Sequence, residues 1–364
     1  MVDFTPSSLF STERLSRLHR ALTDINDDVV HLTALPDTGL AHDHVWISRD
    51  TGPDWIARLP KQSQMQLDPE TNLDYQANCF RRAAQSGHTP DLHGILPISA
   101  DFPRGGLLVS AIEGRPAKLP DDVPAIGEAL ANLHEIALPP VDARPPLASP
   151  RSPWTAMRDE VLAQAAYLDD APIDEATRRR LDTELTLFHD DRELAERIDA
   201  QRCLISFDTH PGNFLITPEG QAVLVDLEKC RYGHPGLDLA HASLYTSTTW
   251  DPASHAVLDT ASVVDFYRHW WAARATSDDA MDIEALVATR RAMWLWSTTW
   301  CAKWLTLHHQ ERDSLAQGED WSAALSEDRL IAHVEDRARH YLSESVIKRV
   351  SDDNHRLSRE LAQT

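Results

Sequence analysis

A short polar loop between two apolar runs carries the residues whose types and spacing could do chemistry. Residues 205–216 read ISFDTHPGNFLI, so Asp208 is followed five residues later by Asn213. After the apolar run at 222–225 comes a second carboxylate, Asp226. A carboxylate and an amide at this spacing, with an aspartate at the end of a strand, are the parts that phosphoryl transfer requires. They supply a base for the acceptor hydroxyl and oxygen ligands for magnesium.

Magnesium is a hard, octahedral cation, usually held by one or two protein carboxylates together with the phosphate oxygens of a nucleotide. Asn213 and Asp226 would suffice as its protein ligands. Because the transition state is loose, the protein mainly positions the reactants and neutralises charge, and Asp208 can act as the base without a raised pKa. We expect Glu228 to be a salt-bridged surface group, with contact to a second magnesium as the alternative.

The segment 208–213, Asp-Thr-His-Pro-Gly-Asn, resembles the D-x-H-P-G-N loop of the aminoglycoside phosphotransferase and choline kinase superfamily, the small-molecule relatives of protein kinases. Residues 126–134 are similar to the A-L-A-x-L-H helix of that family, and residues 236–240 to its D-L-A helix start. The resemblance covers essentially the whole chain. It implies a bilobal, protein-kinase-like α+β fold. A small lobe with an antiparallel sheet, one helix and the hinge would span 1–113, and a larger, mostly helical lobe would span 114–364.

Three positions depart from the family pattern. Ser206 stands where the family has His two residues before the catalytic Asp, so we expect altered support for the loop. On an extended run at 54–59, Arg58 takes the position of the nucleotide-phosphate lysine, with Lys61 as a neighbouring candidate. Gln76 replaces the glutamate that pairs with this lysine, and would orient Arg58 without a full ion pair. Arginine stays charged and binds phosphate bidentately, so Arg58 remains the candidate for the nucleotide phosphates.

A turn at 36–43 precedes two extended runs, 44–48 and 54–59, joined by a loop rich in Asp, Gly and Pro. In the family the equivalent turn covers the nucleotide phosphates with backbone N–H groups. Gly39 is its one glycine, so a plain hairpin turn is an equally good interpretation.

Residues 104–115 contain an apolar strand that ends near a glycine and match the hinge of the family. The resemblance implies that backbone groups of Ser110, Ala111 and Ile112 meet the adenine edge. A buried strand is the alternative and is compatible with the same geometry. The implied cofactors are Mg²⁺ and ATP, and GTP is not excluded.

Trp296, Trp300 and Trp304 recur every four residues and would form one stripe on a helix, with Trp294 turned away from it. The first interpretation is a core-facing helix. The alternative is an aromatic wall of the acceptor pocket, since indole faces attract ammonium groups and stack on sugar rings.

The histidines lack the spacing of a metal site. No H-E-x-x-H or comparable pattern accompanies His241 or the pair at 308–309, so we expect satisfied polar or surface roles for them. His210, inside the loop, is expected to be structural and to hydrogen-bond backbone.

Composition indicates a globular protein of 364 residues that is 42% hydrophobic and 25% charged. The formal net charge of −22 disfavours binding to nucleic acids and anionic membranes, and is compatible with a cationic acceptor, although solubility or salt adaptation explains most of it. No basic leader precedes an apolar core and no apolar run is long enough to cross a bilayer, so the expected location is the cytoplasm. Scattered cysteines predict free thiols, and they are Cys79, Cys203, Cys230 and Cys301.

No other catalytic pattern competes, since the sequence has no phosphate loop, nucleophile elbow or dinucleotide fingerprint. The sequence therefore predicts a magnesium- and nucleotide-dependent kinase that acts on the hydroxyl of a small molecule such as an aminoglycoside, a sugar or an amino alcohol. The alternative is a catalytically silent, kinase-shaped protein that binds a nucleotide or a partner.

Overall fold

The computed structural model describes residues 11–23, 25, 28–36, 39–188, 191–275, 281–308 and 326–361. Positions 37, 38 and 309, which the sequence analysis included, lie outside these ranges. The chain divides into two units. The first unit comprises Met1–Ala84, Pro90–Ile112 and Leu307–Glu335, and the second comprises Gln85–Thr89, Glu113–Thr306 and Asp336–Thr364.

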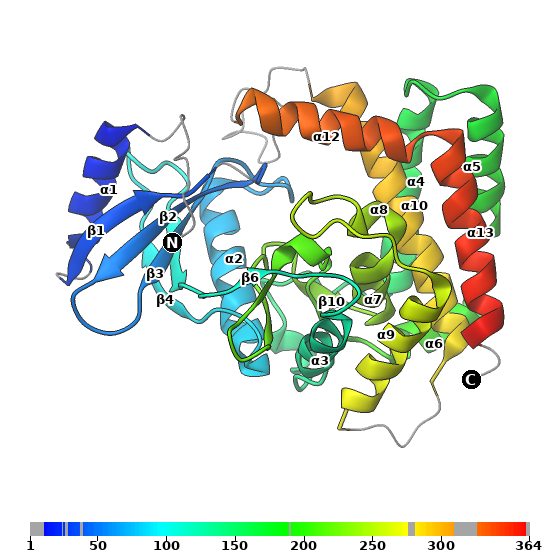
Figure 1. Cartoon of the computed structure of the whole chain (residues 1–364), viewed down its shortest axis with the longest axis horizontal. Helices are drawn as coiled ribbons and strands as arrows, with labels where there is room; N and C mark the ends of the chain where they lie inside the picture. The colour runs from blue at the N-terminus through cyan, green and yellow to red at the C-terminus, as the bar shows by residue number, and fades with distance from the viewer. Residues whose placement is uncertain are drawn as a thin grey trace. The chain divides into compact units, whose positions relative to one another are not determined.

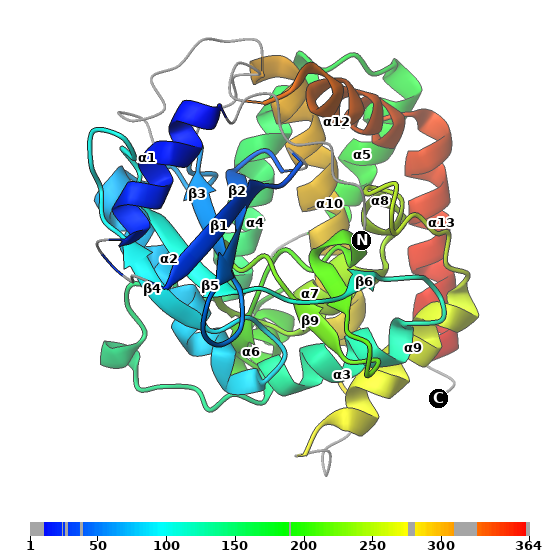
Figure 2. The same cartoon turned by 60° about the vertical axis from the view of Figure 1, so that its left-hand side comes forward.

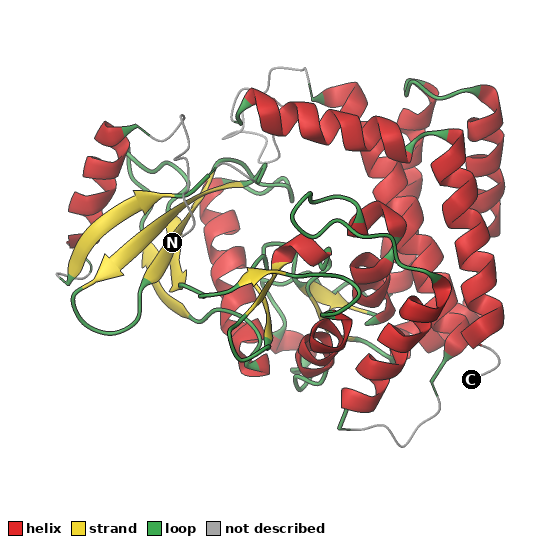
Figure 3. Ribbon diagram, in the orientation of Figure 1, coloured by secondary structure: helices red, strands yellow, loops and turns green. Residues whose placement is uncertain are grey.

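The described part of the first unit is built on an antiparallel sheet with the strand order β1-β2-β3-β5-β4 (Figures 1 and 3). The strands are β1 (Val29–Ala34), β2 (His42–Arg49), β3 (Trp55–Pro60), β4 (Leu92–Leu96) and β5 (Gly106–Ser110). The helices are α1 (Thr12–Thr23) and α2 (Pro69–Ala83), and a 3₁₀ turn, η1 (Ala84–Ser86), follows α2 and crosses into the second unit. The extended runs expected at 44–48 and 54–59 fall on β2 and β3.

Alternation along β3 explains how the two helices pack. Trp55, Ala57 and Leu59 belong to a buried core that also contains Leu18 and Leu22 of α1, and Figure 2 shows α1 over this sheet. Side chains alternate between the faces of a strand, so the residue between Ala57 and Leu59 points to the opposite face. That residue is Arg58, whose guanidinium lies 5.4 Å from the ring centroid of Phe80 on α2. The two helices therefore cover opposite faces of the sheet.

Short strands in the second unit hold the loop that carries the candidate chemistry. β7 (Cys203–Ile205) pairs with β10 (Arg231–Gly233), and β8 (Phe214–Ile216) pairs with β6 (Arg115–Pro116) and β9 (Ala222–Leu224). The predicted loop thus runs from β7 to β8, and the segment with Asp226 runs from β9 to β10. Because β7 and β10 are paired and antiparallel, the start of the loop lies beside the end of the segment that carries Asp226.

The rest of the second unit is mostly helical. Its helices are α3 (Val123–His134), α4 (Pro153–Ala165), α5 (Glu175–Leu187), α6 (Arg192–Ala200), α7 (Gly236–Ser243), α8 (Tyr245–Thr248), α9 (Thr260–Ala273) and α13 (Glu344–Leu361). Its 3₁₀ turns are η2 (Val141–Ala143), η3 (Ala166–Asp169) and η4 (Pro211–Asn213). The bounds of α10 (Ile283–Leu307) and α12 (Asp328–Tyr341) cross the division between the units.

These elements confirm the predicted α+β class, with an antiparallel amino-terminal sheet and a helical carboxy-terminal part. The four cysteines are free and buried, as expected. Within the ranges that the structure describes, no helix is long and apolar enough to cross a membrane.

Candidate active site

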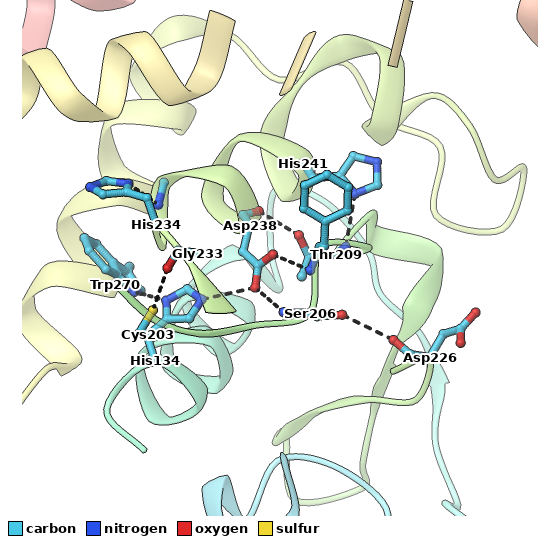
Figure 4. A network of polar contacts seen from close by, with 12 residues as sticks. His134, Cys203, Ser206, Thr209, Asp226, Gly233, His234, Asp238, His241 and Trp270 are labelled. Atoms are coloured by element: carbon cyan, nitrogen blue, oxygen red, sulfur yellow. Dashed lines mark hydrogen bonds and ion pairs between the residues drawn. The ribbon is translucent and has the colours of Figure 1, made fainter. Parts of the chain in front are cut away.

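The backbone of the loop is held by a carboxylate that the sequence analysis had noted only as part of a helix-start motif. Asp238, on α7, is fully buried and accepts hydrogen bonds from the amides of Ser206 and Phe207, each at 2.8 Å (Figure 4). Phe207 has a φ of 64°, in the left-handed region, which costs a non-glycine residue about 1 to 3 kcal/mol. Two amides bonded to one buried carboxylate offset this strain and fix the chain immediately before Asp208.

The two flanking sequence motifs meet at Asp238. His134, the last residue of α3, lies with its Nε2 3.1 Å from Asp238 Oδ2 (Figure 4). On the other side of the ring, the indole N–H of Trp270 donates to His134 Nδ1 at 3.0 Å. An indole N–H can only donate, so Nδ1 is unprotonated and Nε2 carries the proton that is donated to Asp238. This contact joins the motif at 126–134 to the motif at 236–240.

The side chain of Asp208 forms a buried ion pair. Lys229 Nζ lies 2.7 Å from Asp208 Oδ2, and the two side chains are 13% and 14% exposed. Burial tends to raise the pKa of Asp208, but the charge of Lys229, helped by His210 and His241, lowers it below its usual value. Burial likewise opposes the charge of Lys229, whereas Asp208 and Glu228 raise its pKa. Asp208 is therefore ionised, in agreement with a base that has no raised pKa.

His241 supports the residue after the base. Its Nδ1 accepts the amide of Thr209 at 3.1 Å, and Thr209 Oγ1 donates to the carbonyl of Asp238 at 2.7 Å. Burial lowers the pKa of His241 to about 4, so the ring is neutral and can accept this bond. This contact confirms the expected role of His241 as a satisfied polar group.

His210 differs from expectation. Its Nδ1 has no hydrogen-bond partner among the described residues, so the ring-to-backbone bond that we expected is not found at that atom. The backbone carbonyl of His210 instead accepts the amide of Asn213 at 2.9 Å, which closes the turn η4.

The structure brings Asp208, Asn213 and Asp226 together. Asn213 Nδ2 donates to the carbonyl of Asp208 at 2.8 Å, and the carbonyl of Asn213 accepts the amide of Val225 at 2.9 Å. Ser206 Oγ donates to the carbonyl of Asp226 at 3.3 Å (Figure 4). Ser206 thus links the two segments through a long hydroxyl hydrogen bond, while Asp238 holds the backbone of the loop through two shorter bonds.

These residues fit a magnesium ion that completes its shell with water and phosphate. Within the described residues there is no cluster of three or more His, Cys, Asp or Glu side chains that could hold a metal by themselves. Because Asn213 donates its Nδ2 to the backbone, its amide oxygen would be available to a cation. One amide oxygen and one carboxylate match what magnesium takes from a protein when a nucleotide supplies further oxygens.

The prediction that Glu228 lies on the surface is wrong. Glu228 is 5% exposed, and its charge acts on Lys229, whose pKa it helps to raise. Lys229 itself escaped the sequence analysis. Its position could have been noticed in the sequence, because this lysine comes three residues after Asp226 and buried carboxylates such as Asp208 need a cation nearby.

The nucleotide candidates of the first unit have defined surroundings. Arg58 is 4% exposed, and its Nη1 lies 3.3 Å from His44 Nε2 on the neighbouring strand. Gln76 Oε1 lies 3.0 Å from His42 Nε2, and Lys61 Nζ donates to Ser326 Oγ at 2.9 Å. Around Gly39, an added Cβ would meet nothing within 4 Å and φ is not positive, so this geometry does not require glycine.

The hinge candidates are partly committed to the sheet. The amide of Ser110 donates to the carbonyl of Asp91, and the amide of Ala111 donates to the carbonyl of Asp54, each at 3.0 Å. Ser110 is the last residue of β5, in keeping with the buried-strand alternative. Of the three amides, only that of Ile112 has no backbone partner within the described ranges.

The tryptophan stripe divides along α10. Trp304 is buried, and Trp294, outside the stripe, is fully buried. Trp296 and Trp300 are only partly buried. Trp300 lies edge-on to Trp250, with ring centroids 6.0 Å apart, whereas Trp296 lies against Phe207 at 5.1 Å. Trp304 therefore belongs to the core, whereas Trp296 contacts the loop through Phe207.

An antiparallel sheet followed by a helical part, with Asp208, Asn213 and Asp226 on two bonded segments, is the arrangement that the sequence resemblance implied. The phosphotransferase enzyme family matches residues 33–278, more than half of the chain, and the chain belongs to this family. The resemblance of the sequence motifs is thereby confirmed. No curated protein sequence matches the chain.

Solved structures show the same fold. Choline kinase from Cryptosporidium parvum Iowa II has a TM-score of 0.57 at 14% identity, covering 94% of this chain and 97% of that chain. Spectinomycin phosphotransferase, solved with ADP and spectinomycin, has a TM-score of 0.57 at 11% identity, covering 92% and 98%. Macrolide 2'-phosphotransferase from Brachybacterium faecium has a TM-score of 0.53 at 15% identity, covering 87% and 97%.

Proposed function

We propose that the protein is a small-molecule kinase that transfers the γ-phosphate of ATP, in the presence of Mg²⁺, to a hydroxyl of a small acceptor. The observation that carries this proposal is the cluster of Asp208, Asn213 and Asp226 on one buried hydrogen-bonded frame. A protein that only bound a nucleotide would not need an ionised carboxylate held by a buried lysine next to two metal ligands.

Each residue of the cluster has a separate role. Asp208 faces the acceptor hydroxyl and accepts its proton as the bond to phosphorus forms. Asn213, through its amide oxygen, and Asp226 would hold magnesium, which supplies charge neutralisation on the phosphates when bound. Lys229 keeps Asp208 ionised and oriented, and Asp238 fixes the backbone on which Asp208 stands.

Nucleotide binding is assigned to residues 1–113, and catalysis and acceptor binding to 114–364. Arg58 would bind nucleotide phosphate, and the backbone at Gly39 would cover the phosphates. At the hinge, the amide of Ile112 is the best donor to the adenine edge. Carbonyls of Ser110 and Ala111 would serve as acceptors there, which is also compatible with GTP.

The acceptor class follows from charge and from the relatives. The solved relatives are named for choline, spectinomycin and macrolides, and a net charge of −22 is compatible with an acceptor that carries an amino or ammonium group. We place the reaction in the cytoplasm, with no nucleic-acid or membrane partner.

An acceptor screen tests the proposal. The protein is incubated with Mg²⁺ and ATP or GTP and with choline, spectinomycin, a macrolide or a cell extract, and phosphorylated products are identified by mass spectrometry. We expect one product class that disappears in Asp208→Asn and persists in Asp265→Asn, a control at an exposed carboxylate paired with Arg268. Nucleotide binding without any Asp208-dependent product would favour the silent binding protein instead.

A further inference from the structure

The ring of Phe207, next to the base, is enclosed by two side chains that share one carboxylate. The guanidinium of Arg231 stacks 3.8 Å from the centroid of the Phe207 ring, and Trp296 meets the same ring edge-on at 5.1 Å. Glu160, on α4, accepts the indole N–H of Trp296 through Oε1 at 2.7 Å, while its Oε2 lies 3.4 Å from Arg231 Nη1. The carboxylate on α4 therefore connects the residue of β10 and the residue of α10 that pack against Phe207.

Trp296 also lies against the residues that support the base on its other sides. Lys229 Nζ, which pairs with Asp208, is 6.0 Å from the centroid of the indole ring. His241, which accepts the amide of Thr209, lies edge-on to the indole at 6.4 Å. The indole thus meets Phe207 itself and the supports of the next two loop residues.

We propose that Trp296, anchored by Glu160, is the positioning residue that aligns Asp208 for proton acceptance. This inference rests on the proposed function. Phe207 is held in the left-handed backbone region, so its conformation depends on what encloses it. The enclosing groups are tethered to each other: the indole donates to a carboxylate, and the guanidinium pairs with the same carboxylate. If the indole bond is lost, Phe207 and Asp208 gain freedom, and small misplacements of a reacting group are costly in rate.

The chain offers a matched control on the same helix. Trp294 is also on α10, is fully buried, and its indole N–H has no hydrogen-bond partner within the described residues. Trp294→Phe and Trp296→Phe therefore remove the same atoms from one helix, but only the second removes a hydrogen bond to a carboxylate. A purely structural role predicts that the two variants behave alike.

The first measurement needs no acceptor. The amides of Ser206, Phe207 and Thr209 are buried donors, so their hydrogen exchange reports opening of the loop. We expect Trp296→Phe and Glu160→Ala to speed their exchange about tenfold relative to α9, as expected when a bond to a charged acceptor is lost. Trp294→Phe should change the exchange of the loop and of α9 by the same factor.

The second measurement is turnover with the acceptor identified in the screen. Trp296→Phe should lower kcat about tenfold with an unchanged KM for ATP. Adding Glu160→Ala to this variant should lower kcat by less than Glu160→Ala does alone, because the indole bond is already lost and only the Arg231 contact of Glu160 is left to remove. Equal loop exchange in Trp296→Phe and Trp294→Phe would overturn the inference. If wild type phosphorylates nothing while the loop exchange still separates the two variants, the proposed function fails and the positioning of the loop by Trp296 stands.

Discussion

Replacing Lys229 by Met tests how the base is held. At 2.7 Å the gross attraction between Lys229 and Asp208 is about 6 kcal/mol for an effective dielectric constant of about 20. Desolvation of both groups offsets part of this, and removing one partner of a buried pair typically costs about 3 to 5 kcal/mol, because the other charge remains buried and uncompensated. We expect Lys229→Met to lower the free energy of unfolding at neutral pH by about 3 kcal/mol.

The pH dependence has a defined sign. Burial is the largest single influence on Asp208 and raises its pKa, but Lys229 together with His210 and His241 outweighs burial, so the net pKa is lowered. A carboxyl with a lowered pKa in the folded state stabilises the protein above its unfolded pKa, and this contribution is lost as the pH falls through the folded value. The contribution of the pair is therefore complete at neutral pH and fades below about pH 4. In Lys229→Met, burial and Asp226 raise the pKa of Asp208, so the acid limb of kcat moves to higher pH.

Urea unfolding at several pH values and the pH profile of kcat provide the assay. Lys229→Arg keeps the charge and should retain much of the stability, while its different shape shifts Asp208 and lowers kcat. Arg268→Met breaks an exposed pair with Asp265 and should change the stability by no more than about 0.5 kcal/mol. The reasoning is refuted if Lys229→Met is as mild as Arg268→Met and leaves the acid limb where it is in the wild type.

Three further substitutions have defined outcomes. Asp238→Asn replaces one of the two carboxylate oxygens that accept bonds from Ser206, Phe207 and His134. The loop then loses part of its support, so kcat should fall about a hundredfold in steady-state kinetics and Tm should be lower in calorimetry. Gly212→Ala places a Cβ 2.5 Å from Asp251 Oδ2 and 2.8 Å from Asp251 Cβ, which must displace the catalytic loop; a kcat within a factor of about two of wild type would contradict this contact. Arg58→Met should raise the Kd for ATP about tenfold in calorimetric titrations, and an unchanged Kd would remove Arg58 from the nucleotide site.

The sequence predicted those parts of the site that depend on local order. Asp208 and Asn213 lie in one loop and Asp226 follows the hairpin of β8 and β9, so their proximity follows from short connections alone. The strands at 44–48 and 54–59 were predictable for the same reason, because alternation and turn residues are local signals.

The rest of the site depends on contacts between distant segments. The bond of His134 to Asp238 joins residues more than a hundred positions apart, and no pattern in one sequence indicates that two motifs touch. Burial of Glu228 escaped prediction because a glutamate is normally exposed, and the sequence analysis had not noted Lys229, on which its charge acts. The hydrogen bond from the amide of Ala111 to the carbonyl of Asp54 likewise depends on sheet pairing that the hinge sequence does not specify.

Single-turnover transfer by Asp208→Asn tests the central claim most directly. The variant removes the base but leaves Asn213 and Asp226 to hold magnesium, so Mg·ATP should bind with the wild-type Kd. Rapid-quench transfer from labelled ATP to the identified acceptor should be at least about a hundredfold slower than in wild type. Wild-type transfer rates in this variant would contradict the claim that Asp208 accepts the proton of the acceptor hydroxyl.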